Sequence, residues 1–184
     1  MRGWAGKPSH PPLTDFPIVC YAVAAVFDVL SVITGSGDDP SPVAFELYRA
    51  ATFVLIFGLL VAVPTALTGF WDWWKGLDRD GSTGPIGRAK RTQVWRTVNW
   101  HAVVMLTATV VALVDLWVRW AMADEPATPV VPMILSVLAA ASILFGAFYG
   151  GTLVYEYQFN VEPLKGKKVW DETEVDELPG RHET

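Results

Sequence analysis

Residues 130–155 read VVPMILSVLAAASILFGAFYGGTLVY and contain no Asp, Glu, Lys or Arg. A bilayer core of about 30 Å takes about 20 helical residues to cross, so this stretch is long enough to span a membrane. Lipid offers the backbone no hydrogen-bond partners, and a single segment satisfies its own polar groups there only as a helix. The stretch therefore predicts a transmembrane helix.

Three further stretches have the same apolar character, and Pro or Gly residues separate them: residues 16–34, 47–70 and 98–117. The 184-residue chain is 52% hydrophobic and only 18% charged, whereas soluble domains carry about a quarter charged residues. We therefore predict an all-α integral membrane four-helix bundle over residues 16–155. A leader over residues 1–15 precedes it, and a charged tail over residues 156–184 follows it.

Charge and motifs limit the function and the orientation. Twelve of the fourteen Lys and Arg residues fall on the side that holds both termini, so both termini should be cytoplasmic. The net charge of −5 argues against nucleic-acid binding. No phosphate-binding loop, dinucleotide fingerprint or nucleophile elbow occurs in the sequence, and we expect no independent catalytic activity.

Charged residues inside membrane spans are costly and are functional candidates by default. Asp28 and Asp115 lie within spans, and both approach the side opposite the termini. Arg49 and Arg119 lie at a similar depth, so we expect structural ion pairs: Asp28 with Arg49 across helices, and Asp115 with Arg119 one helical turn apart. Fixing the register of the helices is the favoured role of this cluster, and a proton or ion path is the alternative.

Polar residues also gather at the side of the termini. Asp72 ends the second span, Tyr155 ends the fourth, and Asp15 is expected to cap the first helix. His10 and His101 belong to spans that run in the same direction, so they could supply two axial nitrogens to haem b. The basic residues expected to hold its propionates are Arg88, Lys90, Arg91 and Arg96. Trp100 and Phe16 are expected to pack on its ring.

Two other interpretations of the histidines stay open. His10, Asp72 and His101 could hold a non-haem metal ion, or the two imidazoles could bond only to backbone groups or acids. Gly146 and Gly150 are four residues apart, a spacing that favours close helix packing. On the third span His101, Met105, Ala108, Ala112 and Asp115 form one stripe, which we expect to face inward.

The chain resembles a bacterial membrane family, domain-of-unknown-function family 2231 (DUF2231), and this resemblance implies a bacterial inner membrane. The segments that carry the resemblance are HPPLTDFPI (10–18), AVPTALTG (62–69) with Asp72 and Trp73, Asn99 with His101, and GGTLVY (150–155). Some family members look like fusions to Rieske-type iron–sulfur domains, which implies a setting of membrane electron transfer. The chain departs from the fused members at Thr152, where they often have His, and at QFNV (158–161).

From these observations we expect a small subunit of a membrane redox complex, surrounded by lipid and other membrane subunits, that binds haem b through His10 and His101. A cofactor-free structural or assembly subunit is the alternative, and that departure at Thr152 favours it. A small transporter or proton path is a third hypothesis, although four spans are few for alternating access.

Overall fold

A computed structural model describes residues 9–37, 39–78, 93–157 and 159 of the chain. These residues form α1 (His10–Gly35), α2 (Pro42–Asp78), α3 (Gln93–Trp120) and α4 (Val130–Gly151), and a π-helix, η2 (Thr152–Glu156), continues α4. All four long helices are apolar and long enough to cross a membrane. The prediction of an all-α, four-helix membrane bundle is confirmed.

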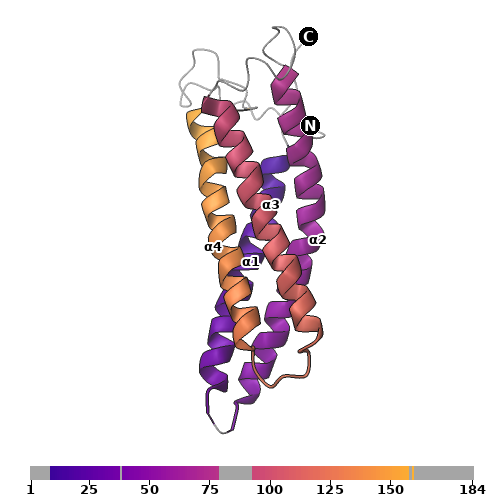
Figure 1. The fold of residues 1–184 in the computed structure, drawn as a ribbon, viewed down its shortest axis with the longest axis vertical. Helices are drawn as coiled ribbons and strands as arrows, with labels where there is room; N and C mark the ends of the chain where they lie inside the picture. Colours follow the sequence, from indigo (N-terminus) through magenta and orange to yellow (C-terminus); the bar gives the residue numbers. More distant parts are fainter. Residues whose placement is uncertain (1–8, 38, 79–92, 158, 160–184) are drawn as a thin grey trace, which may run out of the picture.

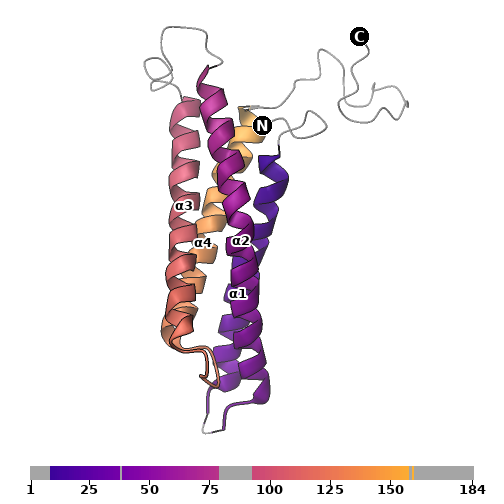
Figure 2. The same cartoon turned by 90° about the vertical axis from the view of Figure 1, so that its right-hand side faces the viewer.

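The helices lie side by side and alternate in direction (Figures 1 and 2). The start of α1 and the end of α4 therefore lie at one end of the bundle, called here the terminal end. The short connections from α1 to α2 and from α3 to α4 lie at the other end, called the loop end. The contacts are most extensive between α1 and α2 and between α3 and α4, and α1 also packs on α4. The bundle is thus two hairpins joined mainly through α1 and α4.

The first helix begins six residues earlier than the predicted start at residue 16. Pro11 and Pro12 are part of its first turn, where proline is tolerated because the N–H that it lacks has no partner within the helix. The helix therefore starts within the range that we predicted as a leader. Ser9 stands at the N-cap, without a side-chain cap bond, so Asp15 is not the cap that we expected.

The second helix also exceeds its predicted range at both ends. Its 37 residues correspond to about 55 Å at 1.5 Å per residue, which is longer than the apolar core of a bilayer. The additional turns at the terminal end carry Asp72. The third helix starts at Gln93, five residues before the predicted span.

The interior of the bundle is built from small residues. Ala24, Ala51, Ala108, Ala112 and Ala139 are fully buried, and such residues let helix backbones approach closely. The predicted inward stripe on α3 is confirmed, because Met105 packs against this core and Asp115 is fully buried. Large apolar side chains instead cover the outside, as expected for a surface that faces lipid.

Candidate functional site

Two histidines meet at the terminal end of the bundle. His10 is the first residue of α1, and His101 lies in the third turn of α3. Their ring centroids are 6.2 Å apart, and the ring planes are nearly perpendicular at 81°. Because the helix starts at His10, this side chain lies on an ordered turn and faces the bundle interior.

Each imidazole is held by a backbone carbonyl of the other helix in its hairpin. His10 Nδ1 lies 3.0 Å from the Thr65 carbonyl oxygen, and His101 Nδ1 lies 2.9 Å from the Gly146 carbonyl oxygen. A carbonyl oxygen can only accept a hydrogen bond, so each Nδ1 carries the proton and donates it. In the neutral ring the lone pair is then on Nε2, which is the usual arrangement of a metal-binding histidine.

Glycines make room for both rings. Gly69 lies four residues after Thr65, and Gly150 lies four residues after Gly146. A helical side chain leans toward the N-terminus and covers the preceding turn, so a glycine at this spacing leaves the carbonyl accessible. A Cβ atom at Gly69 would lie 2.7 Å from His10 Cε1, and one at Gly150 would lie 3.2 Å from His101 Cε1. The glycines at 146 and 150 thus serve the histidine as well as helix packing.

The two histidines line a cavity of about 670 Å³ at the terminal end. This volume is within the usual range of ligand sites, about 300–1,000 Å³. Much of the lining is apolar and comes from α1, α3 and the end of α4, where η2 adds Leu153 and Tyr155. Asp15 and the buried Asp72 also line the cavity, and these carboxylates favour a ligand that carries positive charge.

The distance between the ring centroids is compatible with a single metal ion bound by both imidazoles. Two imidazole nitrogens, each bound at about 2 Å to one metal ion from opposite sides, bring the ring centroids to about 6 Å apart, close to the 6.2 Å found here. The expected non-haem site of His10, Asp72 and His101 is not formed, because the described part of the chain contains no group of three His, Cys, Asp or Glu placed to hold a metal ion.

Several residues expected near a haem lie elsewhere. Trp100 is 59% exposed on the outer face of α3, because successive helical residues point about 100° apart and its neighbour His101 faces inward. Phe16 packs edge-on against Phe57, and the exposed Arg96 bonds to Gln93. None of these side chains lines the cavity. Arg88, Lys90 and Arg91 lie outside the described residues, as does nearly all of the acidic tail.

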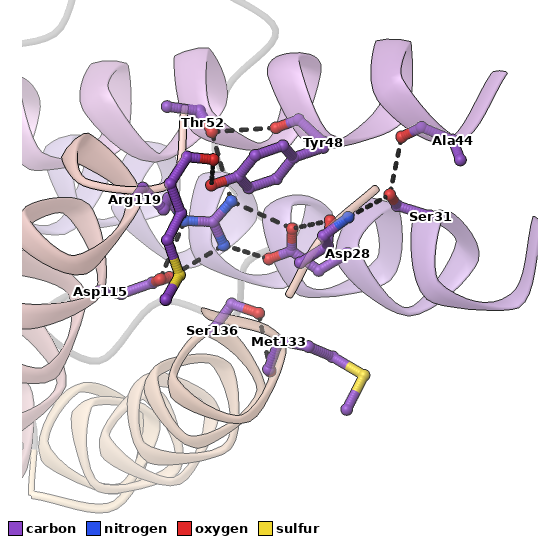
Figure 3. A network of polar contacts seen from close by, with 11 residues as sticks. Asp28, Ser31, Ala44, Tyr48, Thr52, Asp115, Arg119, Met133 and Ser136 are labelled. Carbon is purple, nitrogen blue, oxygen red and sulfur yellow. Dashed lines mark hydrogen bonds and ion pairs between the residues drawn. The ribbon is translucent and has the colours of Figure 1, made fainter. Parts of the chain in front are cut away.

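A second polar cluster is buried at the loop end, and Arg119 is its centre (Figure 3). The guanidinium uses all five of its N–H groups. Nε and Nη2 donate to Asp115 at 2.9 and 3.0 Å, Nη1 and Nη2 donate to Asp28, and Nη1 also donates to Thr52. We call Asp28, Asp115 and Arg119 the buried triad.

The triad corrects one predicted ion pair. Asp115 and Arg119 interact along α3 as the spacing suggested, but Asp28 is paired with Arg119 and not with Arg49. Arg49 is exposed and lies over the Phe45 ring at 5.5 Å. The reason is its position on α2, where the inward face is taken by its neighbour Tyr48, which is only 2% exposed.

Some site residues escaped the sequence analysis. Thr65 and Gly146 act through their carbonyl oxygens, which no side-chain pattern reveals. Thr128 donates to Asp28 from the connection before α4, and Thr52 is an ordinary polar residue in an apolar run. The repeated spacing of Thr65 to Gly69 and of Gly146 to Gly150 was visible in the sequence, but it also fits simple helix packing.

The comparison with known proteins supports the membrane assignment. Residues 6–163 match the family model described as predicted membrane protein (DUF2231). No curated protein and no solved structure matches the chain. The matched residues include both histidines, the two glycines beside them and the buried triad, and they make up most of the sequence. The chain therefore belongs to the DUF2231 family of predicted membrane proteins.

Proposed function

We propose that this protein is a small electron-transfer subunit of a membrane redox complex and holds haem b between His10 and His101. The observation that carries the proposal is the paired arrangement of the rings. Both Nδ1 atoms donate to backbone carbonyls, which leaves the Nε2 lone pairs of two cavity-lining histidines available to bind a metal. Bound haem would supply reversible one-electron chemistry at its iron.

The number of ligands and the apolar lining support a haem more than a small ion, whereas Asp15 and Asp72 oppose the propionates and no Lys or Arg is among the described lining residues. A bare ion bound by two nitrogens would need further ligands, and the described residues do not provide a third. A porphyrin supplies four nitrogens of its own and needs only axial ligands from the protein. Apolar side chains such as Ile18, Val98 and Met105 line the cavity, and such side chains suit the flat apolar ring of a haem.

Two histidine ligands would also favour electron transfer over catalysis at a bound haem. With His10 on one side and His101 on the other, no coordination position would remain for oxygen or a substrate. Because hydrogen bonds fix both rings, the iron would keep the same two histidine ligands in its oxidised and reduced states. Electron transfer between partners fits such a site better than catalysis does.

The test is a reduced-minus-oxidised visible spectrum of protein purified in mild detergent from cells supplied with haem precursor. We expect the bands of a low-spin haem, about one haem per chain, and loss of the bands in His10→Ala and His101→Ala. His182→Ala is the matched control, because it removes the remaining histidine of the chain, and it should leave the spectrum unchanged. Wild-type protein without iron or a visible chromophore would refute the proposal.

A second candidate function is supported by the same hydrogen bonds. The His10 bond to Thr65 joins α1 to α2, and the His101 bond to Gly146 joins α3 to α4. In a cofactor-free structural subunit the imidazoles would serve as polar contacts that fix each hairpin. This function predicts colourless protein that co-purifies with a larger membrane complex, and loss of that association in His101→Ala.

A further inference from the structure

The buried triad encloses more negative than positive charge. Asp28 and Asp115 are fully buried and Arg119 is 2% exposed. With every group ionised, two carboxylates face one guanidinium, and the cluster carries a net charge of −1. Burying an uncompensated charge is costly, so this excess needs a physical explanation.

The surrounding elements provide no second cation. On α2, Tyr48 places its ring 5.4 Å from the guanidinium carbon and donates its hydroxyl to the Met122 carbonyl at 3.2 Å. Arg49 on the same helix is exposed and lies over Phe45. In the connection after α3, Asp124 and Glu125 are exposed acids. The range of α4 contains no Asp, Glu, Lys, Arg or His. Among the described residues, Arg119 alone neutralises the two carboxylates.

The two carboxylates are not equivalent. Asp28 accepts two bonds from Arg119 and a third from the Thr128 hydroxyl at 3.0 Å. Thr128 lies just before the start of α4, where the helix dipole places partial positive charge. Among the described residues Asp115 accepts bonds from Arg119 only, one on each carboxyl oxygen. The surroundings therefore stabilise negative charge better on Asp28 than on Asp115.

The two acids are also close to each other. Nη2 of Arg119 donates to an oxygen of Asp28 and to an oxygen of Asp115, so these two oxygens lie around the same nitrogen atom. When two carboxylates share one buried site, their repulsion favours a state in which one of them keeps a proton.

We propose that the buried triad is a proton-binding site inside the membrane domain, and that Asp115 carries its proton at neutral pH. The bound proton makes the cluster electrically neutral, with Asp28 and Arg119 as the ion pair. The site lies at the loop end, opposite the histidine cavity, and it does not depend on whether haem is bound.

Infrared spectroscopy tests the proposal directly, because a protonated carboxyl and a carboxylate absorb in separate regions. The protein is held in a maltoside detergent, which has no ester carbonyl to mask the signal. In the wild-type minus Asp115→Asn difference at neutral pH we expect loss of one carboxylic-acid carbonyl band. Asp124→Asn, at an exposed position of the same end, is the control and should lose carboxylate absorption only.

Two further variants distinguish loss of the bound proton from loss of the Asp115 side chain. Asp28→Asn leaves one carboxylate for one guanidinium, so Asp115 should ionise and the carboxylic-acid band should disappear although Asp115 is present. Asp115→Glu should move the band without removing it, which covers the case in which Asp115→Asn does not fold. Loss of a carboxylate band in place of the carboxylic-acid band in Asp115→Asn would overturn the proposal, as would a band that persists in Asp28→Asn.

Discussion

If His10 and His101 hold haem as proposed, glycine-to-alanine substitutions at residues 69, 150 and 151 should affect haem binding in an order that the structure sets. A Cβ at residue 69 would lie 2.7 Å from His10 Cε1 and 3.0 Å from its Nδ1, one at residue 150 would lie 3.2 Å from His101 Cε1, and one at residue 151 would meet nothing closer than 4.0 Å. Carbon atoms in favourable contact are about 3.5–4.0 Å apart. Gly69→Ala must therefore move the His10 ring by almost 1 Å, and Gly150→Ala must move the His101 ring by a few tenths of an ångström. Gly151→Ala moves neither ring.

The expected losses follow from these displacements. Gly69→Ala pushes the His10 ring away from the Thr65 carbonyl, and loss of such a ligand-orienting bond typically reduces metal affinity about 10- to 100-fold. Gly150→Ala should reduce the affinity only a few-fold. Gly151→Ala should reduce it least, because it displaces neither ring. Residue 151 also lines the cavity, so this variant measures the effect of a methyl group in the cavity when both rings stay in place.

Haem per chain, measured by pyridine haemochrome and protein assay during titration of the apoprotein, gives the three affinities. The reasoning is refuted if Gly151→Ala loses as much haem affinity as Gly69→Ala, or if all three variants bind like wild type. Circular dichroism of each variant checks that the helical content is unchanged, so that a loss of affinity is not a loss of fold.

Three other predictions concern the bundle and its orientation. Tyr21 is fully buried, and its hydroxyl lies near Thr109 without a hydrogen bond of normal geometry among the described residues. Tyr21→Phe should therefore keep or raise stability by about 1 kcal/mol, measured by thermal unfolding in detergent; clear destabilisation would mean that the hydroxyl is bonded to Thr109. Arg119→Met leaves two unpaired acids and should cost about 3–5 kcal/mol, whereas Asp115→Asn keeps the pair with Asp28 and should cost much less in the same assay. In a cysteine-free background, Asp39→Cys at the loop end should react with a membrane-impermeant thiol reagent added outside intact cells and Glu156→Cys should not; the reverse pattern would place the termini outside.

The spans and the shared end of the two histidines were predictable, because apolar length and an even number of crossings determine them. The start of α1 was not. Pro11 and Pro12 suggested a break before the helix, but their position in the first turn removes no helical hydrogen bond. This misjudged boundary matters for function, since it decides whether His10 lies on the bundle or in a leader.

Side-chain direction limited the rest of the site prediction. Arg49 and Trp100 lie at suitable depths, but each is next to a residue that faces inward, and depth alone does not give the rotation of a helix. In a membrane bundle the side of a helix that faces lipid is apolar like the side that faces the interior. The hydrophobic periodicity that would normally indicate how a helix is rotated about its axis is therefore weak. Tertiary contacts, such as Tyr48 beneath Arg119, settle the orientation.

Each hairpin of the bundle carries one complete half of the histidine site, with its own imidazole, its own carbonyl acceptor and its own clearing glycine. Haem binding would therefore require that the two hairpins have assembled, since neither hairpin can enclose a ligand alone. A chain divided between α2 and α3 and produced as two pieces should become coloured only where both pieces meet in the same membrane. The colour of bound haem would then show that the two hairpins had paired correctly during membrane assembly.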